Sequence, residues 1–275
     1  MKGTDLERIL VTGAGGMIGR AVPFGVRLTR EQLDVTSRAA VAETFRAIKP
    51  SGVLHLASLD IRTCEAKPRE ALEVNVLATR HLALACRDAV IPLFFLSSGA
   101  VFNGPKGQAF LETDEPNPVN LYAQTKYLGE RLIGEILPGQ TLIIRAGWVF
   151  GGHGAHHKKF VDLVKDQALR GETIQAPDDQ TGSPVYVKDL VEKIGELIST
   201  GDRGLVHLSN SGVTSARQMA DESVRLLDSR SRVETVESAR FIPSTLRRSA
   251  TEAIASARHA MRPWKQSLAE YLGKS

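Results

Sequence analysis

The fold is decided by the stretch Arg8-Ile9-Leu10-Val11-Thr12-Gly13-Ala14-Gly15-Gly16-Met17-Ile18-Gly19-Arg20-Ala21-Val22. Its apolar run, residues 9–11, ends in glycines and predicts a strand buried on both faces of a parallel sheet. Glycine permits a positive φ and lets a ligand approach the backbone. We therefore expect a tight turn and a short helix that bind the pyrophosphate of a dinucleotide through Gly13, Gly15, Gly16, Met17 and Ile18. The spacing is Gly-x-x-Gly-x-x-Gly and not the Gly-x-Gly-x-x-Gly of the commonest dinucleotide fingerprint. A glycine-rich turn without a ligand is therefore the alternative.

The composition is that of an ordinary globular protein. The chain has 275 residues, of which 42% are hydrophobic and 24% charged, enough for one large core or two modest ones. We find no apolar leader and no run long enough to cross a membrane, so we expect a cytoplasmic protein. Two cysteines indicate neither a disulfide framework nor a metal site. The net charge of +4 with 5% aromatic residues favours anionic small ligands over nucleic acid.

Strand and helix patterns alternate along the chain. Strands are expected at 9–11, 24–30, 52–57, 92–96 and 141–144, and helices at 17–22, 37–48, 68–90 and 121–136. This order predicts an α/β fold with a doubly wound parallel (Rossmann) sheet, whose ligands lie at the carboxyl ends of the strands. Further helices are expected at 160–169, 187–200, 215–227 and 264–272, with strands at 172–175 and 205–208. We expect a dinucleotide-binding domain of residues 1–152 and 185–203, and a smaller substrate-binding domain of residues 153–184 and 204–275.

Tyr122 and Lys126 lie four residues apart in an expected helix, so their side chains share a face. The pair alone also suits a surface tyrosine beside a solvated lysine. The pair indicates a catalytic site because the chain also has the glycine turn and Ser97-Ser98 at the end of the fourth expected strand.

In this setting the chain resembles the extended short-chain dehydrogenase/reductases, and within them the dTDP-4-dehydrorhamnose reductase family. The resemblance runs over most of the chain. It rests on Thr12–Arg20, Leu33-Asp34-Val35-Thr36, Asn75-Val76, Leu96-Ser97-Ser98 with Val101-Phe102, Glu112-Thr113-Asp114, Pro116-Asn117-Pro118, Tyr122-Ala123-Gln124-Thr125-Lys126, Arg145 with Trp148-Val149, Asp179–Pro184 and Arg262-Pro263-Trp264.

The resemblance implies an enzyme that transfers a hydride from a nicotinamide cofactor to the ketone of a nucleotide-linked 4-keto-6-deoxysugar. Tyr122 would protonate the carbonyl oxygen as general acid. Lys126 would bind the ribose hydroxyls of the cofactor and lower the pKa of Tyr122. Ser98 would hydrogen-bond the same carbonyl oxygen.

The remaining site residues follow from the same resemblance. Asp34 and Val35 would lie near the adenine, and further cofactor contacts are implied at Leu56, Ala57, Ser58 and Asn75. Substrate contacts are implied at Ser98, Gly99, Ala100, Tyr122, Trp148, Lys158 and Lys159.

The sequence departs from the family at three places. The family's Thr-Asp-Tyr after the fourth strand is Ser98-Gly99-Ala100 here, which removes two polar groups and argues against a 4,6-dehydratase. The family's Asn-Asn-Phe is replaced by Lys158-Lys159-Phe160, where a lysine would meet a diphosphate or simply begin a solvated helix. His153, His156 and His157 precede it and suggest a metal only by composition, so no metal site is assigned. The Arg-Pro substrate loop is poorly kept at 245–249.

The expected cofactor is NADPH, with NADH as the alternative. An acidic residue at the end of the second strand normally binds the ribose of NAD. Working back from Asp34, that position falls on Thr29, followed by Arg30. A guanidinium suits a 2′-phosphate. Glu31 is the nearest competing acidic residue.

Two other functions fit the same fold. One is an epimerase that keeps NAD tightly bound, and the other is a non-catalytic subunit similar to the regulatory partner of methionine adenosyltransferase. We expect a nucleotide-diphosphate sugar as the bound partner, no nucleic acid and no membrane, and we allow for a homodimer.

Overall fold

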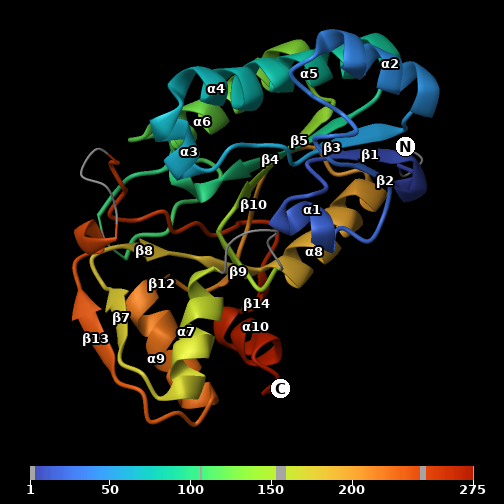
Figure 1. Cartoon of the computed structure of the whole chain (residues 1–275). Coiled ribbons are helices and arrows are strands. Elements are labelled where there is room, and N and C mark those ends of the chain that lie inside the picture. The colour runs from blue at the N-terminus through green and yellow to red at the C-terminus, as the bar shows by residue number, and fades with distance from the viewer. Residues whose placement is uncertain (1–3, 106, 153–158, 242–245, 275) are drawn as a thin grey trace.

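A parallel sheet of six strands forms the centre of the molecule (Figure 1). The computed structural model describes residues 4–105, 107–152, 159–241 and 246–274. The strand order is β10-β5-β4-β3-β1-β2. The strands are β1 (Ile9–Thr12), β2 (Val26–Leu28), β3 (Gly52–His55), β4 (Leu93–Ser98), β5 (Thr141–Ala146) and β10 (Gly204–Leu208). The expected doubly wound parallel sheet is therefore confirmed.

Helices cover both faces of this sheet (Figure 1). On one face, α2 (Arg38–Ile48), α5 (Ala78–Ala89) and α6 (Leu121–Ile136) bury a core against β1, β3 and β4. On the other face, α8 (Val187–Thr200) packs against the same sheet and against the short α1 (Met17–Ala21). The two large cores hold the carboxyl ends of the strands at one edge. Within the described ranges, the search for a helix that could span a membrane finds none.

The long helix expected at 68–90 is interrupted. It consists of α4 (Pro68–Leu72), a π-helical turn η2 (Glu73–Leu77) and α5, and another helix, α3 (Ile61–Ala66), precedes it. The π-helical turn carries Asn75, which is 1% exposed. Such turns hold one residue more than an α-helical turn and are frequent at functional sites.

The smaller part of the molecule contains α7 (Phe160–Arg170), α9 (Ala216–Leu226) and α10 (Trp264–Tyr271) (Figure 1). Short strand pairs lie outside the central sheet: β6 (Trp148–Phe150) with β9 (Pro184–Tyr186), β7 (Ile174–Pro177) with β13 (Val233–Val236), β8 (Thr181–Gly182) with β12 (Thr214–Ser215), and β11 (Asn210–Ser211) with β14 (Met261–Pro263).

One boundary of the expected domains needs correction. We placed residues 204–275 in the smaller domain, but β10 pairs with β5 over Gly204–Leu208 as the edge strand of the central sheet. Apolar and polar residues do not alternate regularly over 205–208. The sequence therefore does not indicate which sheet this strand joins.

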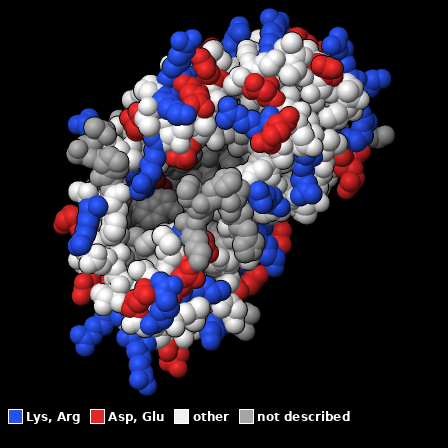
Figure 2. Space-filling view, viewed as in Figure 1, with Lys and Arg blue, Asp and Glu red and all other residues white. Residues whose placement is uncertain are grey.

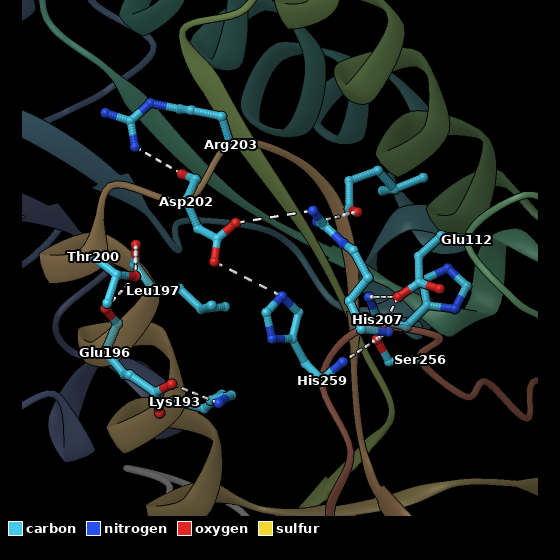
Figure 3. Close-up of polar contacts among 12 residues, drawn as sticks. Glu112, Lys193, Glu196, Leu197, Thr200, Asp202, Arg203, His207, Ser256 and His259 are labelled. Carbon is cyan, nitrogen blue, oxygen red and sulfur yellow. Dashed lines mark hydrogen bonds and ion pairs between the residues drawn. The ribbon is translucent and has the colours of Figure 1, made fainter. Parts of the chain in front are cut away.

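Glu112 fastens the C-terminal segment to β10 (Figure 3). Its carboxylate accepts hydrogen bonds from the His207 backbone N–H at 3.0 Å, the Ser256 hydroxyl at 2.6 Å and the Ala257 N–H at 3.1 Å. Despite the opposing effect of burial, these donors lower the pKa of Glu112 from 4.5 to about 2. The carboxylate form is therefore the form that stabilises this junction.

We expect Glu112→Gln to destabilise the protein by about 1–2 kcal/mol at pH 7, after allowing for solvent screening. The pKa of Glu112 is lower in the folded state, so its contribution is present above pH 4.5 and is lost as the pH falls toward 2. Thermal unfolding at several pH values tests this. The difference in melting temperature between wild type and variant should shrink on acidification; a difference that grows would contradict the assignment.

Candidate active site

The glycine turn after β1 is shaped by close packing on one side and open space on the other. Gly13 has a φ of +72°, and a Cβ there would lie 2.6 Å from the Ala57 nitrogen. At Gly15, by contrast, the nearest atom to an added Cβ is the Thr29 Cγ2 at 4.0 Å. Protein packing therefore requires Gly13 but not Gly15. The open side, at the carboxyl ends of β1 and β2, suits a ligand that approaches the backbone.

Lys126 is buried in the second turn of α6 and is 3% exposed. Its Nζ lies 4.3 Å from the centroid of the Phe95 ring, an arrangement that favours the ammonium form. Burial lowers the pKa of Lys126 to about 8, although the negative charge of Glu130 opposes the shift. The neighbouring His55 is neutral, because burial and then the charge of Lys126 lower its pKa to about 3.

His55 joins β1 to the helix layer. Its Nδ1 lies 2.7 Å from the Thr12 hydroxyl and its Nε2 lies 3.1 Å from the Thr79 hydroxyl. Thr79 donates its own proton to the Asn75 carbonyl at 2.8 Å, so its oxygen accepts from His55. This network assigns the proton to Nε2.

Tyr122 lies in the first turn of α6, one turn before Lys126. The helix starts there because Asn120 caps it, accepting a hydrogen bond from the Ala123 N–H at 2.9 Å. Burial raises the pKa of Tyr122 to about 12, and a hydrogen bond with Ser98 lowers it in part. The direction is opposite to the one we expected, and Lys126 is not among its causes. Tyr122 and Ser98 are nevertheless brought together, from α6 and the end of β4.

Asn75 binds protein groups rather than an open site. Its Oδ1 accepts from the Leu59 N–H at 2.8 Å and from the Ser58 hydroxyl at 3.1 Å, and its Nδ2 donates to the Thr125 hydroxyl at 3.0 Å. Asn75 therefore connects the segment after β3 to α6, next to Lys126. It thereby fixes the position of Ser58, another of the expected cofactor residues.

A buried ion pair lies one turn beyond Lys126. Glu130 and Arg145, both with side chains 4% exposed, form three contacts: Nη2 to Oε2 at 2.6 Å, Nε to Oε1 at 3.0 Å and Nε to Oε2 at 3.2 Å. The Ser97 hydroxyl donates to the same carboxylate. This pair links α6 to β4 and β5, and it fixes the helix that carries Tyr122 and Lys126 against the strand that carries Ser98.

Thr29 and Arg30 follow β2 directly. Thr29 lies beside the glycine turn, and its hydroxyl is the largest cause of the lowered pKa of Glu31. The Arg30 side chain is 73% exposed and lies 3.9 Å from the Glu70 carboxylate, at a cavity of about 490 Å³ that Lys67 also lines. The Asp34 carboxylate is occupied by Thr36, which donates through its N–H at 3.0 Å and its hydroxyl at 2.7 Å.

A cavity of about 800 Å³ opens between the two parts of the molecule, where Figure 2 shows a deep hollow with basic side chains near its rim. Of the expected substrate residues, Trp148 and Lys159 line it. Ser98, Gly99, Ala100 and Tyr122 do not line it. Lys158 lies outside the described residues, as do His153, His156 and His157. Among the residues that are described, no cluster of His, Cys, Asp or Glu could hold a metal ion.

Sequence reasoning missed other residues at this cavity. Arg62 and Arg248 line its wall. Glu252 lies behind the wall and accepts a hydrogen bond from the Trp148 Nε1 at 2.9 Å. Arg62 belongs to the unexpected helix α3. Arg248 lies in the segment 245–249, where the family's substrate loop is poorly kept, and Glu252 lies beyond that segment. Only the tertiary structure brings them to Trp148.

Comparisons with known proteins identify the family of this chain. The profile of the family described as RmlD substrate binding domain matches residues 7–275. The chain is 34% identical to a dTDP-4-keto-6-deoxy-D-glucose reductase from Streptomyces niveus, covering 88% of this chain and 86% of the relative. It is also 34% identical to a dTDP-4-dehydrorhamnose reductase from Streptomyces griseus, covering 93% and 83%.

A solved structure extends the likeness to three dimensions. A dTDP-4-dehydrorhamnose reductase from Bacillus anthracis, solved in complex with NADP, superposes with a TM-score of 0.88 at 25% identity and 100% coverage of both chains. The expected membership of the extended short-chain dehydrogenase/reductases and the expected class, an NAD(P)-dependent sugar-nucleotide reductase, are confirmed. The chain therefore belongs to the RmlD substrate binding domain family, together with the dTDP-4-dehydrorhamnose reductases.

Proposed function

We propose that this protein reduces the ketone of a nucleotide-linked 4-keto-6-deoxysugar with NADPH. The observation that carries the proposal is the meeting of Tyr122 in α6 with Ser98 at the carboxyl end of β4, one helical turn from Lys126. The 800 Å³ cavity is connected to this group through Trp148 in its wall, which donates to Glu252, and the charge of Glu252 acts on Tyr122. The names of the two Streptomyces relatives, reductases of dTDP-linked keto sugars, support the substrate class.

The residues present fit such a cofactor. Gly15 leaves space at the turn that no side chain of the protein fills, and NADPH, when bound there, would supply the hydride. Tyr122 holds its proton at neutral pH because its pKa is about 12, so its hydroxyl is ready to protonate the carbonyl oxygen. Ser98 would donate to the same oxygen and hold it in line with Tyr122. Lys126, still largely protonated at pH 7, would bind ribose hydroxyls.

Cofactor choice is proposed to depend on the cations at the end of β2. Arg30 and Lys67 both face the Glu70 carboxylate, at 3.9 Å and 3.1 Å. A 2′-phosphate placed beside Arg30 would replace this carboxylate as the partner of both cations. Thr29 offers a hydroxyl where NAD-binding proteins have an acidic residue.

We expect Arg30→Ala to weaken NADPH binding about tenfold and to leave NADH binding nearly unchanged. Glu70→Gln is the matched variant: it removes the competing carboxylate and should strengthen NADPH binding. Titration of both cofactors by fluorescence measures the two affinities. Equal losses for NADPH and NADH in Arg30→Ala, or a wild-type preference for NADH, would place the 2′-phosphate elsewhere.

A second prediction concerns pH. Lys126 carries its charge below a pKa of about 8, so kcat/KM for NADPH should fall about tenfold per pH unit above that value. Tyr122 stays protonated over the same range and adds no second slope. The variant Lys126→Met should bind NADPH weakly, with a flat profile. An alkaline slope that persists in Lys126→Met would assign the titration to another group.

The function itself is tested by incubating the protein with NADPH and a panel of nucleotide 4-keto-6-deoxysugars. Stoichiometric loss of NADPH with formation of the alcohol supports a reductase. Conversion of a sugar without net consumption of NADPH indicates the epimerase alternative. A protein that turns over no ketone and instead co-purifies with a catalytic partner is the regulatory subunit.

A further inference from the structure

The segment from Ala250 to Ala255 passes between two other parts of the chain and is hydrogen-bonded to both. On one side, Thr181 donates its N–H to the Ala250 carbonyl at 3.0 Å, and Glu252 donates to the Thr181 carbonyl at 2.9 Å. On the other side, Phe110 donates to the Ala253 carbonyl at 2.8 Å. The backbone of Glu252 is therefore fixed from both directions, and its side chain starts from a defined position.

This segment packs directly on the residue that follows Ser98. A Cβ at Gly99 would lie 2.8 Å from the Glu252 carbonyl oxygen and 3.3 Å from the Ile254 Cγ2. A side chain at position 99 is therefore excluded as long as the segment is in place. Because Gly99 and Ala100 carry no polar side chain, a polar group in this region has to come from elsewhere in the chain.

The carboxylate of Glu252 supplies one. Its side chain is 8% exposed, its Oε2 accepts from the Trp148 Nε1 at 2.9 Å, and its Oε1 lies 3.6 Å from the Arg248 Nε. A buried carboxylate is costly unless it is paired. Trp148 and Arg248 line the 800 Å³ cavity, and Glu252 lies behind them. The Arg248 Nε is itself buried without a hydrogen-bond partner among the described residues.

Glu252 also acts on the reacting end of the site. Its negative charge is one of the causes that raise the pKa of Tyr122, after burial of the phenol. The carboxylate thus lies within electrostatic range of the proton donor on one side and contacts the cavity wall on the other.

We propose that Glu252 is a positioning residue of the substrate site, which orients the Trp148 indole and the Arg248 guanidinium toward a nucleotide-diphosphate sugar. The proposal rests on the proposed function, because it takes the cavity as the place where that sugar binds. Trp148 offers an apolar face to a sugar ring, and Arg248 offers a cation to a diphosphate. The carboxylate fixes both and neutralises Arg248 until the diphosphate arrives.

The first readout does not need turnover. The chain has two tryptophans, so protein labelled with 15N gives two indole N–H signals, and Trp264→Phe identifies the signal of Trp148. In Glu252→Gln the Trp148 signal should shift, because its acceptor loses its charge. It should also shift on addition of dTDP-glucose to the wild type. Glu112→Gln is the matched control, since Glu112 fastens the same C-terminal segment away from the cavity, and it should leave the Trp148 signal in place.

The second readout is affinity. We expect Glu252→Gln to raise the Kd for dTDP-glucose about tenfold in the presence of NADPH, with an unchanged Kd for NADPH and a melting temperature close to that of the wild type. dTDP-glucose has no ketone, so this arm is independent of reduction. Trp148→Phe should raise the same Kd. The double variant of Glu252→Gln with Trp148→Phe should raise the Kd for dTDP-glucose no further than the more damaging single variant does.

The outcomes separate the proposals. A lower melting temperature in Glu252→Gln with unchanged sugar affinity and an unmoved Trp148 signal overturns the positioning role and leaves the reductase function standing. A wild-type protein that binds dTDP-glucose but reduces no keto sugar overturns the proposed function, while the two readouts still decide the role of Glu252. A wild-type protein that binds no nucleotide sugar overturns both.

Discussion

Replacement of Tyr122 by Phe is expected to lower kcat about 10²- to 10⁴-fold, the range attributed to a positioned general acid. The ring stays in place, so packing in the first turn of α6 is preserved and only the proton donor and its hydrogen bond with Ser98 are lost. NADPH affinity should change little. Stopped-flow measurement of NADPH oxidation with the keto sugar gives kcat, and fluorescence titration gives the cofactor affinity.

Tyr127 provides the control. It lies on the same helix and packs against the cluster of Val101, Phe102, Phe110 and Ile254. Tyr127→Phe also removes a phenolic hydroxyl group, but at a position outside the proposed proton path. The kcat of this variant should match that of the wild type. If Tyr122→Phe and Tyr127→Phe have the same kcat, the proton comes from another group.

Loss of Glu130 is expected to have the largest effect on stability. Glu130→Ala leaves Arg145 buried without its partner, and breaking a buried ion pair in this way costs about 3–5 kcal/mol. Urea unfolding measures the difference. The double variant Glu130→Leu with Arg145→Met replaces the pair by apolar groups and should recover most of that loss. A double variant as unstable as Glu130→Ala would show that the ion pair itself, rather than an unpaired charge, stabilises the fold.

Glu130 also connects stability to the reaction. Its charge opposes the loss of the proton from Lys126. Glu130→Gln should therefore move the alkaline slope of kcat/KM below pH 8, since removing the negative charge lowers the pKa of Lys126 further. The direction of this shift distinguishes an electrostatic role from simple loss of folded protein, which would lower activity equally at every pH.

The main elements of the fold could be predicted because their signals are local. The apolar run of β1 and the helices expected at 37–48 and 187–200 depend on neighbours in sequence, and the structure has all three, as β1, α2 and α8. β10 escaped correct assignment because joining one sheet or another is decided by distant partners. The π-helical turn was not predicted, because the apolar residues around it still recur at intervals of three and four, as they do in an uninterrupted α-helix.

The site was predictable where spacing carries chemistry. Tyr122 and Lys126 follow a helical interval, and Ser98 ends a strand. The pKa of Tyr122 was predicted in the wrong direction, because burial is a property of the tertiary structure and outweighs the hydrogen bond with Ser98. The role of Glu252 could not be predicted from the sequence for a related reason. It arises from contacts with Trp148 and Gly99, which lie more than one hundred residues away in the chain.

The π-helical turn η2 determines which side of α5 faces the sheet. Asn75 faces inward to hold the segment after β3, while the apolar side chains of α5 face the sheet. An α-helix advances by about 100° per residue, so the extra residue rotates α5 by about that angle relative to α4. After deletion of one residue between 73 and 77, either Asn75 or the apolar side of α5 would no longer face inward. Insertions and deletions should therefore be excluded here, even though most single substitutions on the exposed side of the same turn are tolerated.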